Sequence, residues 1–267
     1  MTLRAPVRQG ELAYERAGSG PPVVLLHAGV LDRSQWDTEF TTLAADHDMV
    51  RYDARSHGES STRPAGAFTS TEDLAALLDH LRLDRVALVG LSLGARTAID
   101  FALLAPERVT AMLLAGPGYS GMEFTDPHVL ACMAEIDSAA EARDTGAVLG
   151  ALLRAWVDGP YRTPAQVRVE VRARCAAMAL GTLLRHADTA GTVVEVGAGG
   201  RFAELTMPVD VVVGDLDSPD ILRAAERLAA EARDARLVTV PGAGHMVNLD
   251  RPAEFATALG GFLGRMS

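Results

Sequence analysis

The sequence predicts an α/β protein with a doubly wound, mostly parallel sheet and an inserted helical cap. Two patterns predict this fold class. Short apolar runs alternate with helical patterns along most of the chain, and one central stretch breaks that alternation. The chain has 267 residues, of which 48% are hydrophobic, so it can form one large domain with room for an insertion.

The expected strands are short, continuous apolar runs. Runs of this kind are typical of parallel strands that helices cover on both faces. The first run follows a turn rich in glycine and proline, which separates it from the N-terminal segment. The predicted strands are residues 23–26, 86–89, 112–115, 209–213 and 237–240.

The helices are expected between these strands. Thr69 and Glu72 have the spacing of a capping box, which predicts a helix start before Asp73 and a leucine-rich face that ends near Leu83. A second helix, at 93–104, continues directly from the strand that ends near residue 89. The remaining core helices are predicted at 220–232 and 254–263.

The central stretch from 117 to 205 is mostly helical in pattern, with helices expected at 129–136, 148–157 and 167–184. Its length and position favour a cap inserted between two parts of one core, 1–116 and 206–267. A separate small domain is the alternative interpretation.

Charge and lysine content exclude several functions. The formal net charge of −10 argues against binding to nucleic acid, which requires clustered positive charge. All 25 basic residues are arginines, so the chain has neither a Schiff-base lysine nor a P-loop lysine. The spacing of the histidines and cysteines implies no metal, and no organic cofactor is implied.

Cysteine use and hydropathy suggest a cytoplasmic protein. Cys132 and Cys175 are too few for a disulfide framework, and we expect free, buried thiols. The N-terminus lacks the apolar region of a signal peptide, and no apolar run approaches the roughly 18 residues that span a membrane. The sequence does not determine the oligomeric state.

A nucleophile is predicted at Ser92, in the sequence Gly90-Leu91-Ser92-Leu93-Gly94. This Gly-x-Ser-x-Gly pattern lies between a predicted strand and a predicted helix, which is the setting that it requires. A sharp turn there strains the backbone at the serine, and larger side chains two residues away would collide.

The base and the acid are expected in loops that follow later strands. Of the seven histidines, only His245 lies directly after a late strand, behind a glycine-rich turn. Asp217 follows the strand at 209–213 and can reach a histidine on the neighbouring loop. Asp215 is the alternative acid.

The oxyanion hole is predicted from two backbone N–H groups. Gly29 follows the first apolar strand in a loop of small residues, and Leu93 follows the nucleophile. We expect His27 to hold this loop by hydrogen bonds. The candidate residues of the substrate pocket are Trp36, Met122, Trp156, Met178 and Met246, and for each of them a place in the core is the alternative.

Together these segments resemble the α/β-hydrolase superfamily, and the likeness covers most of the chain outside the predicted cap. The superfamily has the same order of serine, acid and histidine along the chain. The chain departs from the family pattern at Ala28 and Ser56, where glycine is usual. The resemblance rests on residues 26–29, 52–60, 90–94, 214–217 and 242–245, followed by 250–252.

The resemblance implies hydrolysis of a small-molecule ester or lactone. Haloalkane dehalogenases and epoxide hydrolases of this fold are similar but have aspartate as nucleophile, so Ser92 argues against both. Hydrolysis of a C–C bond in a diketone is an alternative that uses the same residues. A catalytically silent ligand-binding homologue is the alternative from another class.

Overall fold

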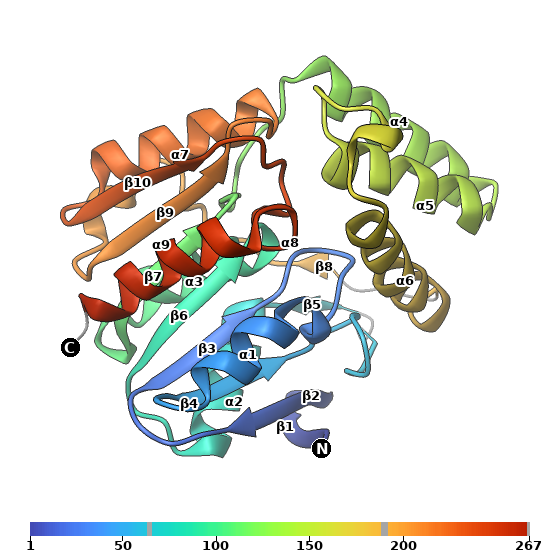
Figure 1. Ribbon diagram of the computed structural model, residues 1–267. Helices are drawn as coiled ribbons and strands as arrows, with labels where there is room; N and C mark the ends of the chain where they lie inside the picture. The colour runs from blue at the N-terminus through green and yellow to red at the C-terminus, as the bar shows by residue number, and fades with distance from the viewer. Residues whose placement is uncertain (63–65, 188–191, 266–267) are drawn as a thin grey trace.

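The computed structural model describes residues 1–62, 66–187 and 192–265. Its centre is an eight-stranded sheet with the strand order β1-β2-β4-β3-β6-β7-β9-β10 (Figure 1). β2 pairs antiparallel with β1 and β4, and all the other neighbours in this sheet are parallel. The predicted fold class, an α/β protein with a mostly parallel sheet, is therefore confirmed.

All five predicted strands are present in this sheet, each extended by one to three residues. They are β3 (Pro22–Leu26), β6 (Val86–Leu91), β7 (Val109–Ala115), β9 (Val209–Gly214) and β10 (Ala235–Val240). The sequence patterns do not predict β1 (Leu3–Val7), β2 (Gly10–Ala17) and β4 (Asp48–Tyr52), nor the small sheet of β5 (Ala67–Phe68) and β8 (Thr192–Val193).

Helices cover both faces of the sheet, which explains the continuous apolar runs. Neighbouring residues of β3 lie in different clusters: Val24 packs with leucines of α2, whereas Val23 packs with Phe255 of α9. The helices of the core are α1 (Asp37–Leu43), α2 (Ser70–Leu81), α3 (Leu93–Leu104), α7 (Pro219–Glu231), α8 (Val247–Asp250) and α9 (Pro252–Gly264).

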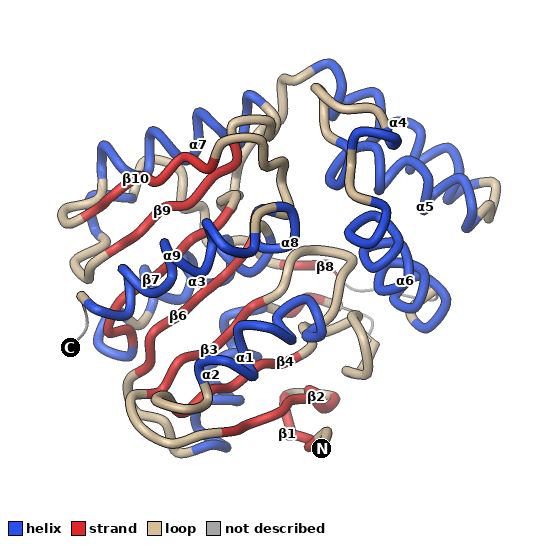
Figure 2. The backbone as a smooth tube through the Cα atoms, viewed as in Figure 1, coloured by secondary structure: helices blue, strands red, loops and turns tan. Residues whose placement is uncertain are grey.

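The stretch between β7 and β9 is largely helical. Figure 2 shows its helices grouped beside the sheet, apart from the helices that cover it. Residues 188–191 of the predicted insertion lie outside the described residues. The helices are α4 (Pro127–Glu141), α5 (Thr145–Leu153), the π-helical turn η3 (Arg154–Asp158) and α6 (Val169–Arg185).

The two cysteines are free and buried, as expected. Burial raises the pKa of the Cys175 thiol to about 12 and also raises the pKa of the Cys132 thiol. Both thiols are therefore protonated at neutral pH, and neither has the lowered pKa of a cysteine nucleophile. Within the described parts of the chain, no helix is both long enough and apolar enough to cross a membrane.

Candidate active site

Ser92 lies on a strained turn between β6 and α3. Its backbone has φ 54° and ψ −107°, a combination that a residue with a side chain rarely adopts. A Cβ atom at Gly94 would lie 2.1 Å from the carbonyl oxygen of Leu26, and one at Gly90 would lie 2.5 Å from the carbonyl carbon of Gly94. Only glycine fits at these two positions, so the close packing of α3 on the neighbouring strands fixes this turn.

His245 and Asp217 form a buried pair at the carboxyl ends of two strands. His245 Nδ1 lies 2.8 Å from Asp217 Oδ2, and both side chains are 2% exposed. Asp217 Oδ1 accepts a hydrogen bond from the N–H of Ser218, which fixes the plane of the carboxylate. Asp215 accepts instead from the N–H of Gly242, so it holds the loop between β10 and His245.

Gly116, at the end of β7, packs against this pair. Its φ is +46°, and a Cβ atom there would lie 3.1 Å from His245 Nδ1 and 3.4 Å from Asp217 Oδ2. The loop after β7 has no acidic side chain, and the space beside Gly116 is filled by His245 and Asp217. A glycine here leaves room for the imidazole beside β7.

The second nitrogen of His245, Nε2, is buried and has no hydrogen-bond partner among the residues that the structure describes. Because Nδ1 is held by Asp217, Nε2 is the nitrogen available for proton transfer. The ring of Trp156, from η3, lies 4.9 Å from the imidazole ring, centroid to centroid. His245 is thus shielded from solvent by a residue of the helical stretch 117–205.

The loop after β3 lies beside the start of α3. A Cβ atom at Gly29 would lie 3.7 Å from the Cβ of Leu93, and both residues line the same cavity as Ser92. The N–H groups in the first turn of α3 have no acceptor within the helix. Gln35 Oε1 accepts a hydrogen bond from the N–H of Ala28, which fixes the loop at the position where the family usually has glycine.

His27 holds this loop, as the sequence suggests. Its Nε2 lies 2.9 Å from the N–H nitrogen of Ala54, and its Nδ1 lies 2.7 Å from the carbonyl oxygen of Ala28. Nε2 can accept from Ala54 only if it is unprotonated, so Nδ1 carries the proton and donates it to Ala28. Burial lowers the pKa of His27, which favours this neutral form.

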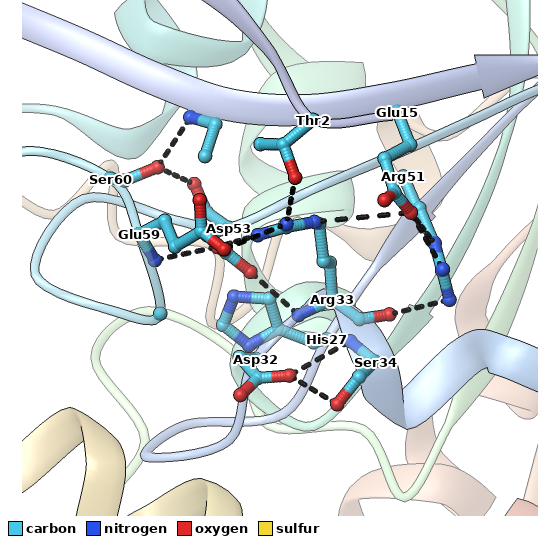
Figure 3. A network of polar contacts seen from close by, with 12 residues as sticks. Thr2, Glu15, His27, Asp32, Arg33, Ser34, Arg51, Asp53, Glu59 and Ser60 are labelled. Atoms are coloured by element: carbon cyan, nitrogen blue, oxygen red, sulfur yellow. Dashed lines mark hydrogen bonds and ion pairs between the residues drawn. The ribbon is translucent and has the colours of Figure 1, made fainter.

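A polar network supports the same loop from the other side (Figure 3). Asp53 accepts hydrogen bonds from the backbone N–H groups of Arg33 and Glu59 and from the guanidinium of Arg33. The segment after β3 is therefore tied to the segment after β4. This network fixes the loop that carries Gly29 without placing a charge in the cavity beside Ser92.

A buried amide pair links the loop after β3 to the helix after His245. Gln35 Nε2 donates to Asn248 Oδ1, and Asn248 Nδ2 donates to the carbonyl oxygen of Gln35, each at 3.3 Å. Asn248 lies in α8, three residues after His245. The pair sets the distance between the two loops that carry Gly29 and His245.

Ser92 lines a cavity of about 330 Å³. Two of the predicted pocket residues, Met122 and Trp156, line it. The other three are buried within the second core cluster: Trp36 packs on Phe255 with ring centroids 5.9 Å apart, and Met178 and Met246 lie nearby in that cluster. Sequence reasoning missed several further lining residues, which are Val30, His57, Arg96, Gly118, Tyr119, Phe124, Glu195 and Ile221.

Two of these missed residues have a local signal in the sequence: Val30, which directly follows Gly29, and Arg96. Arg96 follows Ser92 by four residues, so one turn of α3 brings it to the same side of the helix. Its guanidinium lies 2.8 Å from Glu195, which reaches the cavity from the segment after β8. Tyr119, Phe124 and Glu195 are brought to Ser92 by tertiary folding alone.

Residues 1–62, 66–187 and 192–265 contain no group of three His, Cys, Asp or Glu side chains that could hold a metal ion.

Comparisons with known sequences place the chain among hydrolases. A model of the alpha/beta hydrolase family matches residues 23–258. A putative 2-succinyl-6-hydroxy-2,4-cyclohexadiene-1-carboxylate synthase of Bacillus subtilis is 27% identical over 98% of this chain and 98% of its own length. A 2-hydroxy-6-oxo-2,4-heptadienoate hydrolase of Pseudomonas putida is 36% identical, but over only 41% of this chain and 42% of its own length.

Solved structures share the fold over the whole chain. An esterase of Rhodococcus aligns with a TM-score of 0.82 and 21% identity, covering 100% of this chain and 99% of the esterase. An enol-lactonase of Burkholderia xenovorans aligns with a TM-score of 0.78 and 23% identity, covering 98% of this chain and all of the lactonase. At these identities the similarity establishes the fold.

The turn at Ser92 leads to a prediction on stability. Gly94→Ala forces a Cβ atom against the backbone of β3, and we expect it to lower the free energy of unfolding by about 1–3 kcal/mol or more. Gly260→Ala is the matched control, because Gly260 lies in α9 with nothing within 4 Å of the new Cβ atom. Gly260→Ala should raise the free energy of unfolding by about 0.5–1 kcal/mol. Urea unfolding measures both, and equal stabilities for the two variants would contradict the account of the turn.

Proposed function

Because the chain belongs to the alpha/beta hydrolase family and is a hydrolase, we propose that it cleaves small-molecule carboxylic esters or lactones through Ser92, His245 and Asp217. The observation that carries the proposal is the buried contact of 2.8 Å between His245 and Asp217, with Ser92 on a strained turn that lines the adjacent cavity. These are the parts that acyl transfer requires.

In the proposed first step, Ser92 Oγ attacks the carbonyl carbon while His245 Nε2 takes its proton. Asp217 holds Nδ1–H, so that the imidazole presents the correct nitrogen, and its charge stabilises the imidazolium that forms. The carbonyl oxygen becomes an oxyanion. When the tetrahedral intermediate collapses, His245 returns the proton to the leaving alcohol, or to the ring oxygen of a lactone, and Ser92 remains acylated.

The proposed oxyanion donors are the N–H groups of Gly29 and Leu93. Loss of one such donor typically costs about 3 kcal/mol of transition-state stabilisation. In the second step, water gives a proton to His245 and attacks the acyl carbon, and the protonated histidine then returns the proton to Ser92 Oγ. The acid product leaves and the enzyme is restored.

We propose that the stretch 117–205 is a cap that shapes the acyl site. The cavity of about 330 Å³ lies at the lower end of the range for small-molecule sites. Its lining by Tyr119, Phe124 and Trp156 favours an apolar or aromatic acyl group. This cap contributes Trp156, which touches both the cavity and the ring of His245.

Hydrolysis of a C–C bond is a second candidate, favoured by the similarity of part of the chain to a ring-cleavage hydrolase. It uses the same three side chains, because a diketone also presents a carbonyl carbon to the site. A substrate panel therefore needs vinylogous diketones beside esters and lactones.

We expect purified protein to hydrolyse at least one ester or lactone in a panel of p-nitrophenyl esters, aryl esters and lactones. Ser92→Ala should hydrolyse the same substrate at a rate about 10⁶-fold below that of the native protein. Turnover is followed by release of p-nitrophenol or by pH-stat titration. A Ser92→Ala protein that hydrolyses the same substrate at the native rate would exclude Ser92 as nucleophile, and a folded protein that hydrolyses no substrate would favour a silent ligand-binding homologue.

The two aspartates after β9 give a matched pair of variants. Asp217→Asn should lower kcat by about 10⁴-fold, because the amide no longer holds the required imidazole tautomer. Asp215→Asn should lower kcat by less than about tenfold, since it weakens one loop hydrogen bond, to Gly242. Steady-state kinetics on one ester compares the two, and a larger loss from Asp215→Asn would reverse the assignment of the acid.

A further inference from the structure

Arg162, a partly buried arginine of the stretch 117–205, contacts the loop of His245. Its Nη1 lies 2.9 Å from Asp250 Oδ2, and the two side chains are 8% and 5% exposed. The same oxygen of Asp250 accepts, at 2.8 Å, the N–H of Gly244, the residue before His245. Asp250 thus joins the guanidinium to the backbone that carries the base.

The other donors of Arg162 hold the turn that carries Trp156. Nη2 donates to the carbonyl oxygen of Val157 at 2.7 Å, and Nε donates to that of Asp158 at 3.1 Å. Both carbonyls belong to η3, whose Trp156 ring packs on the imidazole of His245. One guanidinium therefore connects the two segments that enclose His245.

Arg162 also lies directly against the backbone of the His245 loop. A Cβ atom at Gly244 would lie 2.0 Å from Nη2 of Arg162 and 2.8 Å from its Cζ. The guanidinium rests on the backbone beside His245, and a side chain at position 244 would displace it. Movement of Arg162 would therefore change the contacts of the residue next to the base.

We infer that Arg162 is a positioning residue for His245, an inference that rests on the proposed function of His245 as the base. Its planar fork fixes the turn of Trp156, the carboxylate of Asp250 and the backbone of Gly244 in one arrangement. A displacement of about 1 Å in a reacting group can lower a rate about a hundredfold, so a clamp at this point acts on the chemical step. By this argument the cap contributes to catalysis through the position of the base as well as through the shape of the pocket.

The test uses full-length Arg162→Ala and an ester that the native protein hydrolyses. We expect kcat, and the second-order rate at which a fluorophosphonate inactivates the enzyme, to fall together by about tenfold to a hundredfold. KM should stay within about threefold, because Arg162 itself does not line the pocket. Millimolar guanidinium ion should restore part of the lost kcat.

Arg174→Ala is the matched control. Arg174 of α6 also joins the cap to the core, through Asp37 and the carbonyl oxygen of Ser34, and neither residue contacts His245. Its kcat and its inactivation rate should stay within about threefold of native, without rescue by guanidinium. A second control, Arg162→Ala with Asp250→Asn, removes the unpaired carboxylate and should keep the loss in kcat if position rather than charge is responsible.

Arg162→Lys keeps the charge but lacks the planar fork, so its kcat and its inactivation rate should lie between those of the native protein and of Arg162→Ala. If Arg162→Ala does not fold, Arg162→Lys replaces it in the test. A folded Arg162→Ala protein with unchanged kcat and inactivation rate would overturn the inference, as would a change in KM alone or an equal loss in Arg174→Ala. If the native protein is not inactivated at all, the proposed function itself fails.

Discussion

The close approach of α3 to β3 is the contact on which the candidate site depends. Gly94 leaves no room for a side chain beside the carbonyl oxygen of Leu26, so the helix begins at the sheet surface and the preceding residue must turn sharply. That turn lifts Ser92 above the carboxyl edge of the sheet with a strained backbone. The same approach brings Leu93 beside Gly29, so one packing contact places Ser92 and both proposed oxyanion donors.

The parallel sheet supplies the remaining groups from the same edge. Asp217 follows β9 and His245 follows β10, and because these strands are neighbours their loops meet over Gly116. Trp156 of the helical stretch packs on the imidazole, and Arg162 ties that stretch to the core through Asp250. His245 is therefore held jointly by residues of the core and of the stretch 117–205.

Sequence reasoning predicted the features whose signals are local. The apolar runs identify the parallel strands because both faces of those strands are buried. The glycines at 90 and 94 mark the turn at Ser92, because a side chain at either position would collide with nearby backbone. It missed β1, β2 and β4, which form the antiparallel edge. β2 is partly exposed and carries the charged residues Glu11, Glu15 and Arg16, so no continuous apolar run marks it. It also missed contacts between distant segments, such as Gln35 with Asn248 and Arg162 with Asp250, because no spacing along the chain encodes them.

The central claim is that Ser92 is an activated nucleophile. The most direct measurement is to incubate the folded protein with a fluorophosphonate, digest it and locate the adduct by mass spectrometry, with Ser92→Ala in parallel. The account predicts one adduct, on the peptide that contains Ser92, and none in the variant. An adduct on another residue that persists in Ser92→Ala, or a folded protein that remains unlabelled, would contradict it.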